Sequence, residues 1–175
     1  MLKRLLSLGA AAIAAVASAC EEGPASVAGG WRSPATWSTM VHASASGPML
    51  VEVRGDPFGL GREDLAAAAA QAMTNQIIGR ALAFTADRDA APKPQYRVVL
   101  AFGPAPDASP DQLCDGSVAT ARESGEKITV LAVFCDRGQR LASVTGWVAR
   151  VEGVADKRFR QLLGQMVREL FGSAP

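Results

Sequence analysis

The chain has 175 residues, of which 49% are hydrophobic and 20% charged, a composition that favours a folded protein over a disordered one. Its 18 basic and 17 acidic residues nearly cancel, so no charge excess indicates a nucleic acid partner. Aromatic residues make up only 6% of the chain, which is sparse for a surface that stacks sugars or bases.

The first nineteen residues are typical of an export signal. Lys3 and Arg4 form a basic start, residues 5–17 are almost wholly apolar, and the small side chains of Ala17-Ser18-Ala19 suit a signal peptidase. The apolar run is shorter than the roughly 20 residues that a membrane-spanning helix needs. The pattern therefore predicts a cleaved signal peptide over residues 1–19.

Cys20 directly follows the predicted cleavage site, which is where lipoprotein processing requires a thiol that accepts a diacylglycerol. We therefore expect a lipoprotein that is anchored to a bacterial membrane through Cys20 and faces the periplasm. One alternative stays open, because lipoprotein signals favour leucine where this chain has Ala17. Ordinary cleavage after Ala19 would release a soluble periplasmic protein.

Residues 20–35 are rich in Gly, Pro, Ser and Ala, and this composition predicts a flexible tether in front of a single domain over residues 36–175. Early in that domain, residues 37–43 and 49–54 alternate between apolar and polar side chains, as strands do. Residues 63–77 carry apolar side chains four apart, with two carboxylates in the first turn, which predicts a helix.

The second half of the domain predicts a strand over residues 96–102 and a proline-rich loop over 103–111. Residues 128–135 are apolar on both faces, as in a central strand, and residues 141–151 are the expected hairpin partner. Gly146 within that partner indicates a bulge or a crowded position.

A long amphipathic helix is predicted at the end of the chain. Apolar side chains follow the helical spacing throughout residues 159–171, Asp156 is placed to cap the first turn, and Gly172 is placed to end the helix. The predicted fold class is α+β. We expect a two-layer sandwich with an antiparallel or mixed sheet of about four to five strands and two helices packed on one face.

Cys114 and Cys135 are the two thiols that remain once Cys20 is assigned to lipid. Because an exported protein meets an oxidising compartment, this pair predicts a disulfide. Two cysteines and one histidine are too few soft ligands for a closed zinc site, so no metal ligand is predicted.

No residue is predicted to be catalytic. His42 is the only histidine, and the serines near it lack the setting of a nucleophile elbow. A periplasmic hydrolase that uses His42 or loop carboxylates stays open as an alternative, because sequence spacing does not give distances in space. The carboxylates in question are Asp56, Glu63, Asp64, Asp107, Asp111 and Asp115.

Nucleotide binding is not expected either. Gly59-x-Gly61 lies between a predicted strand and a predicted helix, but Asp64 stands where a phosphate-binding turn has its third glycine. Glu63 adds a second negative charge, which would repel a phosphate. We therefore expect no cofactor.

Five segments resemble small exported proteins of alphaproteobacteria. They are residues 47–58 with the motifs Val-Glu-Val and Pro-Phe, the 96–102 strand, Leu113-Cys114, the strand end 132–135, and the closing helix 159–171. These relatives have no assigned activity, so the resemblance implies an exported protein and no catalytic residue. The helix-and-sheet plan is also similar to that of two-layer envelope assembly lipoproteins. We therefore expect a non-catalytic accessory, assembly or binding role in the periplasm, with an envelope protein as a partner.

Overall fold

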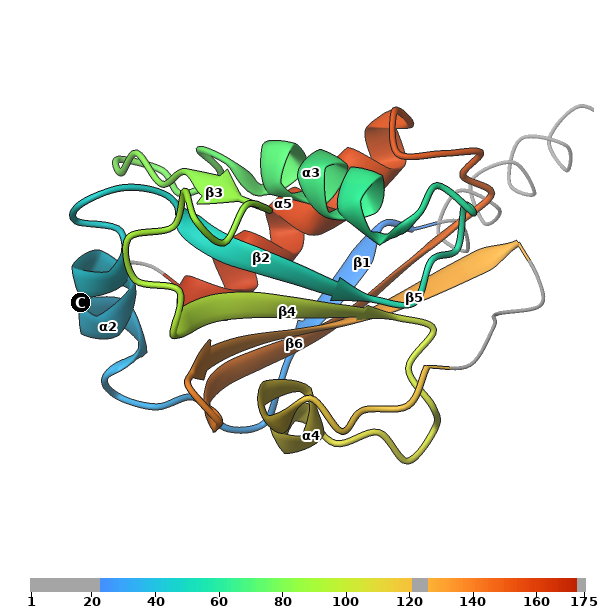
Figure 1. Ribbon diagram of the computed structural model, residues 1–175. Helices are drawn as coiled ribbons and strands as arrows, with labels where there is room; N and C mark the ends of the chain where they lie inside the picture. Colours follow the sequence, from blue (N-terminus) through green and yellow to red (C-terminus); the bar gives the residue numbers. More distant parts are fainter. Residues whose placement is uncertain (1–22, 121–125, 173–175) are drawn as a thin grey trace, which may run out of the picture.

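A computed structural model describes residues 23–120 and 126–172, so the predicted signal peptide and Cys20 lie outside the described residues. The described chain folds around one six-stranded sheet with strand order β1-β6-β5-β4-β2-β3 (Figure 1). The strands are β1 (Ala25–Ala28), β2 (Met49–Arg54), β3 (Phe84–Thr85), β4 (Tyr96–Phe102), β5 (Lys127–Asp136) and β6 (Gln139–Ala149). The helices are α2 (Thr36–Ala43), α3 (Arg62–Met73), α4 (Pro110–Asp115) and α5 (Lys157–Phe171).

The sheet is mixed, which confirms the predicted α+β class. Strand β2 runs parallel to β3 and β4, whereas β4, β5, β6 and β1 pair with one another in antiparallel fashion. The predicted count of four to five strands and two helices is too low for the described residues. Strands β1 and β3 have 4 and 2 residues, too few to produce a periodic pattern.

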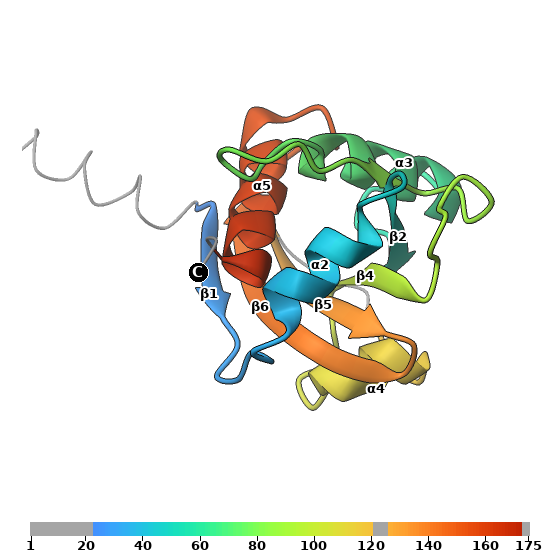
Figure 2. The ribbon, with the colours of Figure 1, turned by 90° about the vertical axis from the view of Figure 1, so that its left-hand side faces the viewer.

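Helices α3 and α5 cover one face of the sheet (Figure 2), as predicted for the two long helices. The rings of Phe102 on β4 and Phe159 on α5 stack at 6.0 Å across this interface. Helix α5 begins and ends as its sequence indicates. The Asp156 side chain accepts a hydrogen bond from the Arg158 amide at 2.8 Å, and Gly172 follows the last helical residue.

Gly146 on β6 is the crowded position that the sequence allowed for. A β-carbon added there would lie 2.8 Å from Leu162 Cδ1 and 3.0 Å from Met166 Sδ, so glycine lets α5 approach the sheet closely. The bulge in this hairpin is elsewhere, between Phe134 and Cys135 of β5.

The opposite face carries a smaller core under α4, so the sandwich has three layers there and not two. Leu113 and Cys114 of α4 pack on β4 and β5, where the buried residues are Val99, Ala101, Leu131, Val133 and Cys135. The sequence predicted a loop up to residue 111. Helix α4 forms because Ser109 and Gln112 make a reciprocal capping box and Pro110 occupies the first helical position.

Two predictions for the first part of the chain are wrong. Residues 37–43 belong to helix α2 and not to a strand, because Thr36, Met40 and Ala43 are buried at helical spacing. Residues 25–28, expected within a flexible tether over 20–35, pair with β6 as strand β1. The order of this segment extends to Trp31, whose ring lies 5.3 Å from the Arg140 guanidinium.

Candidate functional site

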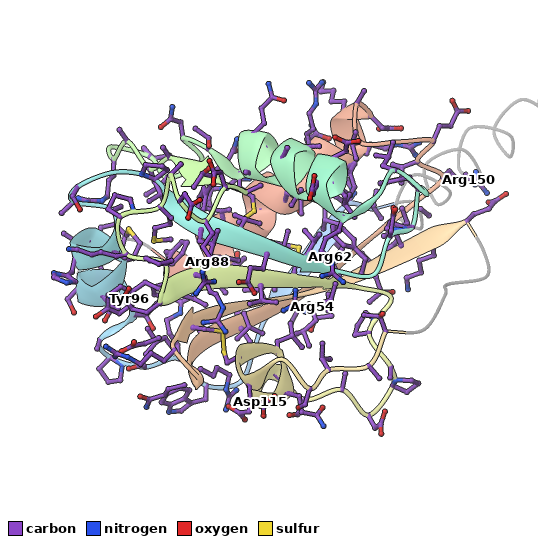
Figure 3. All side chains as sticks on the ribbon, viewed as in Figure 1. Arg54, Arg62, Arg88, Tyr96, Asp115 and Arg150 are labelled. Carbon is purple, nitrogen blue, oxygen red and sulfur yellow. A yellow bond between two sulfur atoms is a disulfide. The ribbon has the colours of Figure 1, made fainter. Side chains whose placement is uncertain are left out.

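His42 is exposed on α2, at the end of the sheet where β2 and β4 begin. Its ring lies edge-on to Tyr96, which Figure 3 labels, at 5.7 Å, and its Nε2 lies 3.2 Å from Lys93 Nζ. Lys93 Nζ also donates a hydrogen bond to the His42 carbonyl oxygen at 2.7 Å. Asp56 follows the other end of β2, so the structure does not bring His42 and Asp56 together for the hydrolase alternative.

The candidate carboxylates are divided between the two faces of the sheet. Glu63 and Asp64 lie in the first turn of α3, on the face that α3 and α5 cover. Asp111 and Asp115 belong to α4, on the opposite face. Asp111 pairs with Arg140 at 3.1 Å, and Asp115 accepts hydrogen bonds from Ser117, which lower the pKa of its carboxyl group. These contacts give the two α4 carboxylates local structural roles.

Asp56 organises the loop between β2 and α3. Its carboxylate accepts hydrogen bonds from the amides of Phe58, Gly59 and Gly61 at 2.7–3.1 Å. Desolvation raises the pKa of Asp56, but hydrogen bonds from the loop amides, chiefly that of Gly61, outweigh it and leave the pKa below its ordinary value. The amides that a phosphate-binding turn would present to a ligand therefore point at the chain's own carboxylate.

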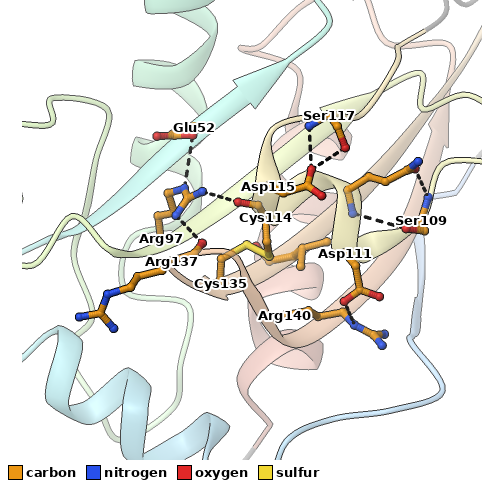
Figure 4. The surroundings of a disulfide bond; sticks show 12 residues. Glu52, Arg97, Ser109, Asp111, Cys114, Asp115, Ser117, Cys135, Arg137 and Arg140 are labelled. Carbon is orange, nitrogen blue, oxygen red and sulfur yellow. Dashed lines mark hydrogen bonds and ion pairs between the residues drawn. A yellow bond between two sulfur atoms is a disulfide. The ribbon is translucent and has the colours of Figure 1, made fainter.

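Cys114 and Cys135 lie at bonding distance, in agreement with the predicted pairing. Their sulfur atoms are 1.99 Å apart (Figure 4), and their Cα atoms are 5.6 Å apart, a separation within the range of protein disulfides. The bond fastens α4 to β5, and both residues are buried in the smaller core. It is a structural cross-link in an apolar setting.

Arg97 on β4 connects the disulfide region to β2, a role that the sequence analysis missed. Its guanidinium donates to the Cys114 carbonyl at 2.7 Å and to the Arg137 carbonyl at 2.9 Å, and its Nε lies 3.4 Å from Glu52 (Figure 4). The Nε contact is an ion pair without hydrogen-bond geometry. A charged residue inside a strand that is otherwise largely apolar was the available signal.

Part of the edge of β2 is open. Strand β3 pairs only with Met49 and Leu50, so no described strand covers residues 51–54 on the side opposite β4. A cavity of about 660 Å³ runs along this edge, between the first turn of α3 and residues 86–88. We call this cavity with its lining residues the β2 groove. Its strand lining is Val51, Glu52, Val53 and Arg54.

Arginines surround the β2 groove (Figure 3). Arg54, Arg88 and Arg97 each lie within 3.4 Å of a Glu52 carboxylate oxygen, so three positive charges share one negative charge. Arg62 adds a further guanidinium at the start of α3, and Glu63 and Asp87 complete the charged lining. Arg54, Arg62 and Arg88 balance the three carboxylates of the lining, so the excess of positive charge is local to Glu52, where Arg97 adds a guanidinium from outside the lining. An arginine-rich edge of this kind can receive a carboxylate through bidentate hydrogen bonds.

No group of three or more His, Cys, Asp or Glu side chains in the described part of the chain is placed to hold a metal ion. Within residues 23–120 and 126–172, none of the helices combines the length and the apolarity that crossing a bilayer requires.

Comparisons with known proteins show a distant likeness to a solved structure. No family model matches the chain, and no curated protein matches it. Among solved structures, the chain is similar to a dodecamer of a PelC variant from Paraburkholderia phytofirmans, with a TM-score of 0.45 and 12% sequence identity. The match covers 85% of this chain and 98% of that one. A likeness at this level carries no argument about function, which has to come from the chain's own residues.

Proposed function

We propose that the protein is an envelope lipoprotein, anchored through Cys20 and facing the periplasm, that binds an extended segment of a partner protein in the β2 groove. Its role is that of a non-catalytic accessory or assembly component. The export signal and the position of Cys20 support the location. The open edge of β2 is the observation that carries the binding role.

An open strand edge offers backbone hydrogen-bonding groups to another strand. In the pairing of β2 with β3, the Met49 amide donates to the Ala83 carbonyl at 2.9 Å, so alternate residues of β2 direct their backbone groups to that side. Val51 and Val53 are the next residues in that alternation. A partner strand laid beside them would continue the sheet where β3 stops, as in recognition by strand addition.

The charges along the edge indicate which segment fits. Charged side chains at a sheet edge discourage unselective pairing, so a partner has to match them. Because positive charge is in excess around Glu52, the favoured occupant is an extended segment that alternates carboxylate and β-branched side chains. Its carboxylates would pair with Arg54 and Arg88 while its backbone pairs with β2.

A designed peptide tests this groove. We expect the hexapeptide acetyl-VEVEVE-amide to shift the amide resonances of residues 51–54 and 86–88 in an NMR titration of the protein, whereas acetyl-VKVKVK-amide leaves them in place. The Arg88→Glu variant should weaken binding at least about tenfold, because it replaces an attraction by a repulsion at a position whose side chain is 65% exposed.

The matched control is Arg160→Glu, the same charge reversal at an exposed residue of α5 away from the groove. It should leave the affinity within about twofold of the unmodified protein. Three results would each contradict the proposed binding site. They are equal resonance shifts with both peptides, resonance shifts confined to other strands, and an equal loss of affinity in the two variants. Both variants should keep the amide spectrum of the folded domain.

The anchor is tested separately by intact-mass analysis of the protein purified from bacterial membranes. We expect a chain that starts at Cys20 and carries the added mass of a diacylglycerol, and a Cys20→Ala variant that loses both the added mass and the membrane fraction. If the chain instead starts at an unmodified Cys20 and is found in the soluble periplasmic fraction, the proposed lipid anchor is wrong and the protein is released after cleavage.

A further inference from the structure

The described chain begins against one particular end of the sheet. Gly23 packs on Trp147 so closely that an added β-carbon would lie 2.8 Å from the Trp147 carbonyl oxygen. Two residues later Ala25 pairs with Trp147 in the register between β1 and β6. The chain therefore enters the fold at the end of the sheet where β6 finishes and β5 begins, which we call the Trp147 end.

The tether between the anchor and this end is very short. Cys20 precedes Gly23 by three residues, and a chain spans at most about 3.6 Å per residue, so the Cα atoms of the two residues lie within about 11 Å of each other. This bound holds for every arrangement of the intervening residues. The flexible tether predicted over residues 20–35 would have allowed the domain to move far from a membrane, whereas strand β1 holds the chain on the sheet from Ala25 onward.

We propose that the Trp147 end of the sheet stands directly against the bilayer in the anchored protein, with α2 and the β5–β6 turn directed away from it. This inference rests on the proposed anchor at Cys20. A lipid-bearing Cys20 whose Cα atom lies within about 11 Å of that of Gly23 leaves no room for a partner protein between the Trp147 end and the membrane surface.

The side chains at the Trp147 end suit a membrane interface. Trp147 is half-buried under Lys127, whose Nζ lies 4.5 Å from the centre of the indole ring, and Leu60 in the nearby 55–61 loop is 42% exposed. A shallow hollow of about 360 Å³ opens here, with a lining that includes Pro57, Phe58, Ile128 and Val151. Tryptophan, apolar residues and lysine together are typical of the boundary between headgroups and acyl chains.

Charge does not hold this end to the bilayer. Lys127 and Arg150 are matched by Glu126 and Glu152 around the hollow, and Arg150 pairs with Glu126 at 3.2 Å. With the positive charge balanced, attraction to anionic lipids adds little. The short tether is therefore what sets the orientation, which makes its length the variable to test.

The native tryptophans report this orientation. Thr36, next to Trp37, donates a hydrogen bond to the Leu141 carbonyl, and Leu141 lies six residues before Trp147 on β6, about 20 Å along a strand. One variant keeps Trp147 alone (Trp31→Phe, Trp37→Phe) and the other keeps Trp37 alone (Trp31→Phe, Trp147→Phe). Each chain, starting at Cys20, is coupled through its one free thiol to maleimide lipid in phosphatidylcholine vesicles that contain dansyl-labelled headgroups.

We expect energy transfer to dansyl to be at least about twofold more efficient from Trp147 than from Trp37, since transfer falls steeply with distance. A flexible insert of about twelve Gly and Ser residues before Gly23, with a root-mean-square length of about 19 Å, should remove most of that difference. Equal transfer from the two tryptophans, stronger transfer from Trp37, or a difference that the insert leaves unchanged would overturn the proposal. Because the coupling is chemical, the outcome does not depend on whether cells attach a lipid to Cys20, which the intact-mass analysis decides.

Discussion

Replacing Leu163 by aspartate is expected to unfold the domain. The Leu163 side chain is fully buried where α5 packs on the sheet, and losing its contacts alone costs about 2–5 kcal/mol. The new carboxylate would also have to be buried without a partner, which adds several kcal/mol. The sum reaches the total stability of about 5–15 kcal/mol that small domains have. Loss of the cooperative thermal transition by circular dichroism is the expected measurement.

Gln161→Asp is the matched control, because it places the same charge on an exposed position of the same helix. We expect its free energy of unfolding to stay within about 0.5 kcal/mol of the unmodified protein, as for Arg160→Ala. Similar melting curves for Leu163→Asp and Gln161→Asp would mean that α5 does not pack on the core as described.

The correctly predicted elements have a periodic pattern of apolar residues in their own sequence. Helix α5 has a complete apolar stripe, a capping aspartate and a terminal glycine, so its limits follow from residues 156–172 alone. Strands β4, β5 and β6 have 7 to 11 residues and a consistent burial pattern. Local periodicity is sufficient where an element is long and one face or both faces are buried.

The elements that were missed depend on contacts from elsewhere in the chain. Strand β1 forms because β6 offers it an edge, and none of its own four residues is buried. Seven of the eight residues of α2, 37–43, fit a strand pattern because so short a segment fits both periods loosely. Only its packing, with Met40 buried and the Thr36 hydroxyl donating to Leu141, decides between them.

The features of the candidate site likewise fall into those that the sequence predicts and those that depend on contacts from elsewhere in the chain. The disulfide was predictable from the number of cysteines and the expected compartment, because both are properties of the whole sequence. The β2 groove was not predictable from the sequence. Its open edge arises because β3 ends after pairing with two residues of β2, and neither strand's sequence determines how many residues pair. Glu52 and Arg97 could have been singled out as charges within apolar strands, but their contact needs the register of β2 against β4.

The disulfide is the second feature whose loss should have a large effect. It closes a loop of 21 residues, and constraining such a loop in the unfolded chain stabilises the folded state by about 3 kcal/mol. In a chain that also carries Cys20→Ser, the replacement of Cys114 and Cys135 by alanine should therefore lower the melting temperature by about 6–12 °C. Differential scanning calorimetry of the oxidised protein and this variant measures the change.

Reduction of the unmodified cysteine pair provides the control for the alanine substitutions. A strong reductant should lower the stability of the Cys20→Ser protein by a similar amount and leave the alanine variant unaffected, because that variant has no bond to lose. The hydrogen bond from the Arg97 guanidinium to the Cys114 carbonyl does not depend on the disulfide. It therefore still holds the start of the cross-linked loop on β4 after the disulfide is reduced. An oxidised protein no more stable than its reduced form would mean that Arg97 and the smaller core suffice to hold α4 in place.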